Sequence, residues 1–127
     1  EGAPPVAGGR FRVLVDLAID EGWHLNAHRP GAEHLVPARV TVDAKGPFSL
    51  ADVDYPEGEL LAPGGQALRA YAGGARLALE VFVEAGAAPG PATLAIELEG
   101  QLCDESRCLA PERYRLELPL VLRASGS

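Results

Sequence analysis

Cys103 and Cys108 are the two cysteines of this 127-residue chain, and four residues separate them. Thiols this close can form a disulfide with each other, and the loop that such a bond closes is very small. A loop of this size contributes only about 2 kcal/mol to stability in the chain-entropy model. A bond that adds little to the fold but can be made and broken suggests thiol–disulfide chemistry. A local structural staple in a hairpin is the alternative.

The loop between the cysteines carries charges of both signs. Asp104 and Glu105 would disfavour a neighbouring thiolate and so protect the reduced pair from unwanted oxidants. Arg107, next to Cys108, would act in the opposite direction, because a positive neighbour stabilises a thiolate. A simple polar hairpin tip is the alternative interpretation of the two acids.

Metal binding is the other chemistry that the residue types allow. His24, His28 and His34 are spaced four and six residues apart, and with a carboxylate such as Glu33 they could hold zinc. No pattern puts these histidines on one strand face, and the cysteine spacing differs from that of a zinc knuckle. We therefore predict surface or loop histidines, no metal and no cofactor. Motifs of serine hydrolases, phosphate loops and dinucleotide sites are also missing from the sequence.

The composition is that of one globular domain. The chain is 47% hydrophobic, and 127 residues suffice for one domain with its own core. A net charge of −7 argues against nucleic acid or an anionic membrane as the partner. No apolar run approaches the roughly 20 residues that span a bilayer, so we expect no direct membrane insertion by this segment. Because the first residue is Glu1, we expect a processed protein or a domain of a longer one.

Hydrophobic residues recur with a period of two, as in strands with one buried face. The segments concerned are 11–19, 77–83, 94–98 and 114–122, with shorter candidates at 35–42, 48–53 and 67–71. Turns rich in Gly and Pro separate them, and no segment shows a helical period. About seven strands of this kind predict an all-β fold, an immunoglobulin-like antiparallel β-sandwich. A small barrel is the alternative.

The same patterns divide the chain and place two individual residues. We expect the domain at residues 10–123, after a linker at 1–9 and before a tail at 124–127. Pro119 cannot donate a ladder hydrogen bond, so the last strand should lie at a sheet edge. Trp23, the single tryptophan, is expected to fill the core of the sandwich.

Residues 94–122 are expected to form one hairpin with the cysteines at its tip. The alternation of Leu94, Ile96 and Leu98 marks the buried face, so Gln101 and Cys103 should lie on the opposite face. Cys103 would then be near the surface, where a partner thiol could reach it, as thiol–disulfide exchange requires. A bulge at Gly100 would reverse this orientation.

The cysteine hairpin resembles that of a known family. The segment Gly100-Gln-Leu-Cys-Asp-Glu-Ser-Arg-Cys-Leu-Ala-Pro111, with Leu116-Glu-Leu-Pro-Leu120 after it, is similar to one in the N-terminal periplasmic domain of DsbD. DsbD is the transmembrane thiol:disulfide interchange protein, and the domain is also called the disulfide bond corrector domain. Other similar segments occur in the family's order: Gly22-Trp-His-Leu-Asn26, residues 36–42, Val53-Asp-Tyr-Pro56 and Ala70-Tyr-Ala-Gly73.

This resemblance implies an immunoglobulin-like sandwich with a redox-active Cys103–Cys108 pair. It implies protein-disulfide reductase activity, in which a membrane-embedded domain of the same parent chain reduces the pair. The pair would then reduce thioredoxin-like or disulfide-isomerase proteins in the periplasm or elsewhere outside the cytoplasm. By position in the family, Cys108 would attack the partner disulfide and Cys103 would resolve the mixed disulfide.

The surroundings of the pair depart from those of the best-known members. Those members have one more residue between the cysteines, and some have tyrosines at the positions of His24 and Asn26. A protonated His24 near the thiols would favour the thiolate, and a half-exposed strand histidine without such a role is the alternative. The family's shielding loop corresponds to residues 58–65, which contain Glu59 but no aromatic residue. The expected environment of the pair is therefore His24, Asn26, Glu59, Asp104 and Glu105.

A function of a different class is also consistent with these residues. An immunoglobulin-like adaptor domain of a larger protein could carry the two cysteines as a structural disulfide. The reduction potential separates the two hypotheses, because structural disulfides lie below about −300 mV.

Overall fold

The computed structural model describes residues 5–31, 35–61, 68–104 and 106–124, and these residues form strands and no helix. The strands are β1 Arg10–Ala18, β2 His24–Asn26, β3 Arg39–Val42, β4 Phe48–Asp54, β5 Glu59–Leu61, β6 Leu68–Tyr71, β7 Gly74–Val83, β8 Gly90–Gly100, β9 Leu102–Cys103 and β10 Glu112–Leu122. Every pairing between these strands is antiparallel. The predicted all-β class is therefore confirmed.

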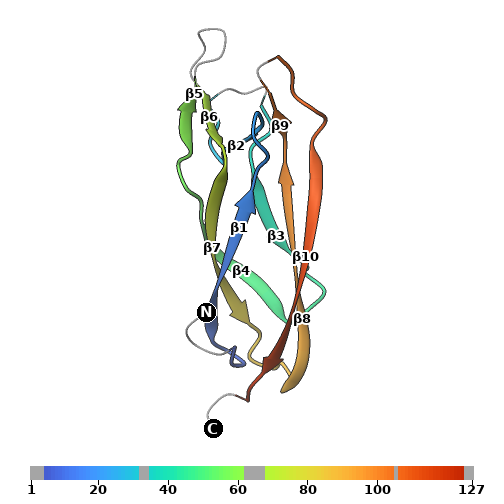
Figure 1. Cartoon of the computed structure of the whole chain (residues 1–127). Helices are drawn as coiled ribbons and strands as arrows, with labels where there is room; N and C mark the ends of the chain where they lie inside the picture. Colours follow the sequence, from blue (N-terminus) through green and yellow to red (C-terminus); the bar gives the residue numbers. More distant parts are fainter. Residues whose placement is uncertain (1–4, 32–34, 62–67, 105, 125–127) are drawn as a thin grey trace.

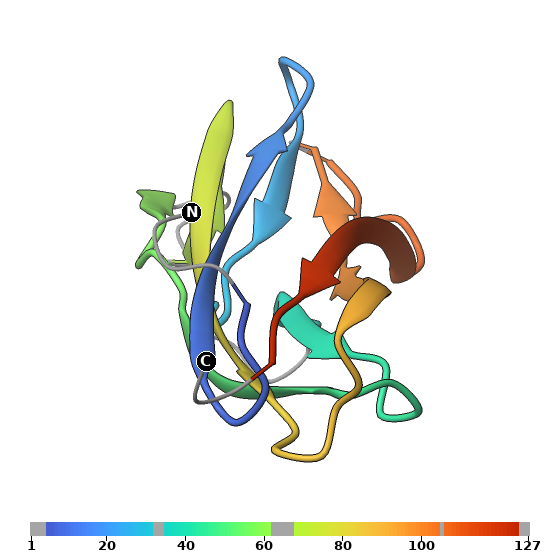
Figure 2. The same ribbon diagram turned by 90° about the horizontal axis from the view of Figure 1, so that it is seen from below.

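Two three-stranded sheets form the body of the sandwich. Their strand orders are β1-β7-β4 and β10-β8-β3, and Figures 1 and 2 show them as two facing layers. The two central strands supply the middle of the core, because their alternating apolar residues point between the layers. These residues are Leu77, Leu79, Val81 and Val83 of β7, with Leu94, Ile96 and Leu98 of β8. This arrangement is the predicted immunoglobulin-like sandwich.

A third sheet, of order β5-β6-β2-β9, lies at one end of the sandwich. Two of its strands continue strands of the main layers. β6 leads into β7 through Ala72 and Gly73, and β8 leads into β9 through Gln101. Since β7 and β8 belong to different layers, this end sheet connects the layers and carries the cysteine hairpin at its edge.

Strand β10 lies at a sheet edge, as Pro119 predicted, but its apolar face is only partly covered. Tyr114, Leu116 and Leu118 retain 38%, 53% and 36% exposure, although their partners on β8 are buried. Tyr114 and Leu116 line a groove of about 440 Å³ that is also lined by residues 15–18 of β1. The expected burial of this face of β10 was therefore wrong over these three residues.

The described part of the predicted linker is hydrogen-bonded to the domain. The Ala7 amide donates to the Arg123 carbonyl at 3.1 Å, and the Gly8 amide donates to the Val83 carbonyl at 2.9 Å. Ala7 is also buried, with 5% exposure. The two ends of the described chain thus lie together, at the end of the sandwich opposite strand β9 (Figure 1). In the described residues there is no helix long and apolar enough to cross a membrane.

Candidate functional site

A disulfide joins Cys103 and Cys108, which face each other as an antiparallel bridge with their Cα atoms 4.0 Å apart. Backbone hydrogen bonds close the loop on both sides of the bond. The Asp104 amide donates to the Arg107 carbonyl at 2.8 Å, and the Leu109 amide donates to the Leu102 carbonyl at 2.9 Å. The predicted pairing at the tip of a hairpin, at one end of a sandwich, is confirmed.

The two sulfurs lie in different environments. Cys103 belongs to β9 and is only 3% exposed, whereas Cys108 follows the turn and is exposed. The expectation that Cys103 lies near the surface was therefore wrong. The alternation itself holds, because Leu102 packs against the core and Cys103 points to the opposite face. Strand β2 pairs with β9 and brings the buried Asn26 against the Cys103 sulfur on that face.

Strand β2 holds its residues beside β9. His24 pairs with Cys103 and Leu25 pairs with Leu102. Asn26 is fully buried, and its Oδ1 lies 4.0 Å from the Cys103 sulfur. Two of the positions expected beside the pair, His24 and Asn26, are thus brought next to Cys103.

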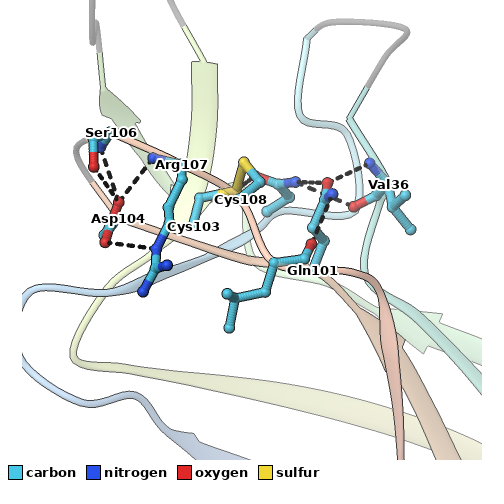
Figure 3. Close-up of a disulfide and its surroundings, with 9 residues drawn as sticks. Val36, Gln101, Cys103, Asp104, Ser106, Arg107 and Cys108 are labelled. Atoms are coloured by element: carbon cyan, nitrogen blue, oxygen red, sulfur yellow. Dashed lines mark hydrogen bonds and ion pairs between the residues drawn. A yellow bond between two sulfur atoms is a disulfide. The ribbon is translucent and has the colours of Figure 1, made fainter.

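A second amide, that of Gln101, links Asn26 to Val36. Figure 3 shows Gln101 and Val36 beside the disulfide. Asn26 Nδ2 donates to Gln101 Oε1 at 2.9 Å and to the Val36 carbonyl at 3.4 Å. Gln101 Oε1 also accepts the Val36 amide at 3.1 Å, and Gln101 Nε2 donates to the Leu109 carbonyl at 3.2 Å. Gln101 was not singled out from the sequence as a site residue. In the sequence, the feature that pointed to Gln101 was its position on the same strand face as Cys103.

His24 is half-buried, and its burial lowers the pKa of the imidazole, while the Asp104 charge raises it to a smaller extent. The net direction is downward, so the neutral imidazole is favoured at pH 7 more than in an ordinary histidine. A permanent imidazolium that activates the thiols, which the sequence allowed, is therefore not favoured at neutral pH.

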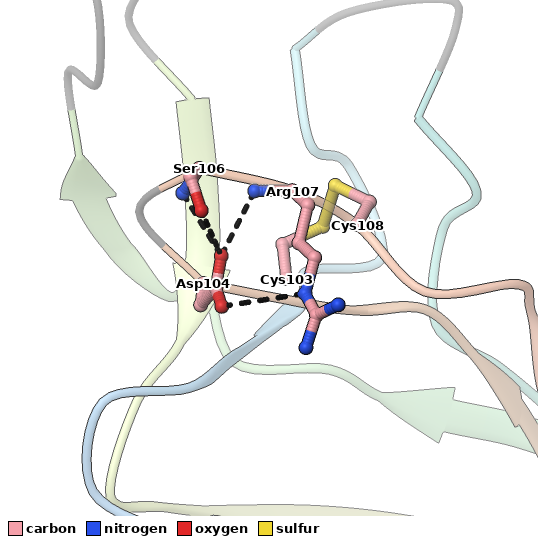
Figure 4. A network of polar contacts seen from close by, with 5 residues as sticks. All are labelled: Cys103, Asp104, Ser106, Arg107 and Cys108. Atoms are coloured by element: carbon pink, nitrogen blue, oxygen red, sulfur yellow. Dashed lines mark hydrogen bonds and ion pairs between the residues drawn. A yellow bond between two sulfur atoms is a disulfide. The ribbon is translucent and has the colours of Figure 1, made fainter.

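Asp104 organises the turn between the cysteines, as Figure 4 shows. Its Oδ1 accepts the amides of Ser106 and Arg107 at 2.9 and 2.8 Å and the Ser106 hydroxyl at 3.2 Å. Arg107 Nε lies 3.7 Å from Asp104 Oδ2. The amide of Ser106, then that of Arg107, lower the pKa of Asp104. The Asp104 carboxylate thus uses its hydrogen bonds to hold the turn. This agrees with the interpretation of Asp104 as part of a polar hairpin tip. Glu105 lies outside the described residues.

Trp23 lies beside this turn and not in the core. It is half-buried, and the Arg107 guanidinium carbon lies 6.0 Å from its ring centroid. This distance is at the outer limit of a cation–π contact. The expectation that Trp23 fills the core was wrong, because the turn after β1 carries it to the groove at the hairpin end.

Glu59 is not beside the cysteines. It lies on β5, at the opposite edge of the end sheet from β9, and pairs with Ala70 of β6. Residues 62–65 of the expected shielding loop lie outside the described residues. Across this sheet, adjacent strands lie about 4.8 Å apart, so Glu59 is separated from β9 by three such intervals.

The described histidines occupy unlike surroundings. His24 lies beside Cys103. His28 stacks on Tyr55, with the ring centroids 3.7 Å apart, and its Nδ1 forms a hydrogen bond with the Ala38 carbonyl at 2.7 Å. His34 and Glu33 lie outside the described residues. Within the described ranges, no group of three or more His, Cys, Asp or Glu side chains could hold a metal ion.

Comparisons with known proteins agree with this geometry. A family model described as the N-terminal part of thiol:disulfide interchange protein DsbD matches residues 3–119. The reduced N-terminal domain of DsbD from Neisseria meningitidis is 18% identical, with a TM-score of 0.57 over 88% of this chain and 79% of that chain. The N-terminal periplasmic domain of ScsB from Proteus mirabilis is also 18% identical, with a TM-score of 0.64 over 89% of this chain and 42% of that chain. No curated protein sequence matches.

The two structural neighbours support the fold, and the family model covers nearly the whole chain, including both cysteines. The described hairpin carries a disulfide at the position that the resemblance assigned to the redox pair. The chain belongs to the family of N-terminal domains of the thiol:disulfide interchange protein DsbD.

Proposed function

We propose that this domain passes reducing equivalents, through Cys103 and Cys108, to thioredoxin-like or disulfide-isomerase proteins outside the cytoplasm. The observation that carries the proposal is the asymmetry of the disulfide, in which Cys108 is exposed and Cys103 is 3% exposed. Thiol–disulfide exchange needs one sulfur that a partner can reach and a second that stays within reach of the first. The pair meets both requirements on a family scaffold of interchange proteins.

The exchange proceeds in two displacements. The Cys108 thiolate attacks one sulfur of the partner disulfide, which forms a mixed disulfide and releases the other partner sulfur as a thiolate. Cys103 then loses its proton and attacks Cys108, which re-forms the domain disulfide and releases the second partner sulfur. The two partner thiolates each take up one proton. Two electrons and two protons have then moved from the domain to the partner.

Before the next cycle, a second dithiol must reduce the Cys103–Cys108 disulfide again. We propose a membrane-embedded redox domain of the same parent chain as this donor, as the family resemblance implied. An oxidising compartment, the periplasm or its equivalent, suits a protein whose cysteines form a disulfide. The structural neighbour from Proteus mirabilis is itself described as a periplasmic domain.

Trapping with cysteine variants tests the order of attack. Cys103→Ser leaves Cys108 able to form the mixed disulfide but removes the resolving thiol, so a covalent complex with a thioredoxin-like protein should accumulate. Cys108→Ser is the matched control and should trap much less, because the remaining sulfur is buried. Equal trapping through either cysteine would contradict the assigned order.

The reduction potential tests the exchange function itself. An exchanging pair should equilibrate with a glutathione or thioredoxin couple at a potential above about −300 mV. A lower potential, together with no trapped complex from either variant, would favour the adaptor hypothesis with a structural disulfide.

A further inference from the structure

Hydrogen bonds to the backbone fix the orientation of the two side-chain amides near Cys103, those of the buried Asn26 and the half-buried Gln101. The Val36 amide can only donate, so the Gln101 atom that receives it is the oxygen, Oε1. The Leu109 carbonyl can only accept, so the other Gln101 atom is the nitrogen. Gln101 Oε1 and the Val36 carbonyl then both require a donor from Asn26, which places Nδ2 toward them. These contacts settle the choice between the two amide orientations.

Asn26 consequently presents a carbonyl oxygen to the Cys103 sulfur, 4.0 Å away. Asn26 is fully buried, so solvent does not compete for this oxygen. The disulfide sulfur carries no hydrogen and cannot donate to it. Reduction gives Cys103 an S–H group, which can donate to Asn26 Oδ1 at this position. Among the described residues, no other donor to this buried oxygen is seen in the oxidised domain, so reduction of the disulfide supplies it with one.

The same oxygen disfavours a thiolate on Cys103. Its partial negative charge faces the sulfur at a buried position, and burial by itself also penalises the charged form. Cys108 is exposed and has no such neighbour among the described contacts. After reduction, the negative charge is therefore more stable on Cys108 than on Cys103.

The other polar groups near Cys103 do not cancel this effect. Burial lowers the pKa of His24, across the strand pair, and so favours its neutral form at pH 7. Asp104 and Arg107 lie 3.7 Å apart and offset one another's charge. Glu105 is outside the described residues, and a carboxylate there would also disfavour a thiolate.

We infer that Asn26, oriented by Gln101, keeps Cys103 as a neutral thiol in the reduced domain and so leaves the thiolate on Cys108. This inference rests on the proposed exchange function and supplies its order of attack. Asn26 contacts a reacting sulfur, and Gln101 is a positioning residue that acts through Asn26. The S–H donor bond also favours the reduced domain over the oxidised one.

The ionisation of Cys103 tests this inference without any partner protein. In Cys108→Ser, Cys103 is the single thiol, and its thiolate absorbance can be followed against pH with the cysteine-free protein as the blank. Adding Asn26→Ala should make the thiolate about two- to tenfold more populated at a given pH, the effect of one buried hydrogen bond. This corresponds to a downward shift of the titration by up to about one pH unit. Gln101→Leu should shift the curve in the same direction, because it frees the Asn26 amide.

The redox equilibrium provides a second readout in the protein with both cysteines. Asn26→Ala should move the equilibrium with glutathione toward the disulfide by about two- to tenfold. A tenfold change equals about 30 mV for this two-electron couple. Val40→Ala is the matched control: Val40 is a buried core residue of β3 outside the amide cluster. It should lower thermal stability and leave both the titration and the equilibrium unchanged.

Unchanged curves for a folded Asn26→Ala protein would overturn the inference, and so would equal shifts from Val40→Ala. If Asn26→Ala does not fold, the S–H stretching band of Cys108→Ser decides the question. A band shifted to lower frequency than in the denatured protein supports the donated hydrogen bond, and an unshifted band contradicts it. These measurements report on Cys103 alone. Failure of partner trapping would thus remove the proposed function while leaving the ionisation result in place.

Discussion

Gly100 and Leu25 approach each other so closely that a side chain at position 100 would have to displace the Leu25 side chain. A Cβ atom added to Gly100 would lie 2.7 Å from Cδ1 of Leu25, which is itself 4% exposed. Gly100 ends β8, just before the chain continues into β9, and Leu25 lies on β2. This contact therefore sets how tightly β2 packs against the base of the cysteine hairpin.

Gly100→Ala should destabilise the domain by about 1–3 kcal/mol, the usual cost of overpacking a core. Gly86→Ala is the matched control, because a Cβ there meets no atom within 4 Å. Denaturant unfolding of both variants measures the difference. Equal stability of the two variants would mean that Leu25 moves aside without cost, and that the tight contact is not needed.

Arg107→Ala should loosen the turn from Trp23 and change the fluorescence of this single tryptophan. The expected loss of stability is small, about 0.5–1 kcal/mol, because the contact is exposed and lies at the limit of the cation–π distance. Arg115→Ala is the control, since Arg115 forms an exposed ion pair with Glu117 on β10 instead. Identical emission spectra of Arg107→Ala and the unmodified protein would show that the ring and the guanidinium do not interact in solution.

The turn itself should respond to acid through Asp104. The amides of Ser106 and Arg107 lower the pKa of the Asp104 carboxyl. The hydrogen bonds that this carboxylate accepts are therefore fully present above about pH 4, the ordinary carboxyl pKa. They weaken as the pH falls through the lowered value. The amide chemical shifts of Ser106 and Arg107 should follow this titration by NMR. Asp104→Asn keeps an oxygen acceptor without the charge. In this variant the amide chemical shifts of Ser106 and Arg107 should not change with pH over the same range.

The long strands of this domain were predictable because their alternation is sustained. Strands β1, β7, β8 and β10 each run for nine residues or more, and a period of two is then unambiguous. Strands β2, β5 and β9 have two or three residues, too few for a period to appear. These short strands form most of the end sheet, so the site's scaffold could not be derived from alternation.

The pairing of the cysteines was predictable from their spacing, but the burial of Cys103 was not. Alternation gave the correct face for this residue. Whether that face meets water depends on Asn26, which lies far from Cys103 in sequence and reaches it through the pairing of β2 with β9. Leu116 of β10 is the opposite case. Its alternation predicted a buried side chain, but it lines an open groove because no other strand of the described residues covers it there.

His24 should make the domain less stable as the solution becomes mildly acidic. Its folded-state pKa is lowered by burial, so the unfolded chain takes up a proton below about pH 6.5 that the folded domain does not bind. By linkage, the free energy of unfolding then falls as the pH decreases from about 6.5 toward the lowered value. Denaturant unfolding at several points between about pH 7 and pH 5 measures this slope.

Two variants assign the slope to His24. His24→Gln cannot titrate in this range, so its free energy of unfolding should be flatter with pH than that of the unmodified domain. Asp104→Asn removes the charge that partly raises the pKa of His24 and should therefore steepen the loss on acidification. Equal slopes in His24→Gln and the unmodified domain would show that another group binds the proton. The burial of His24 beside Cys103 would then not control its charge.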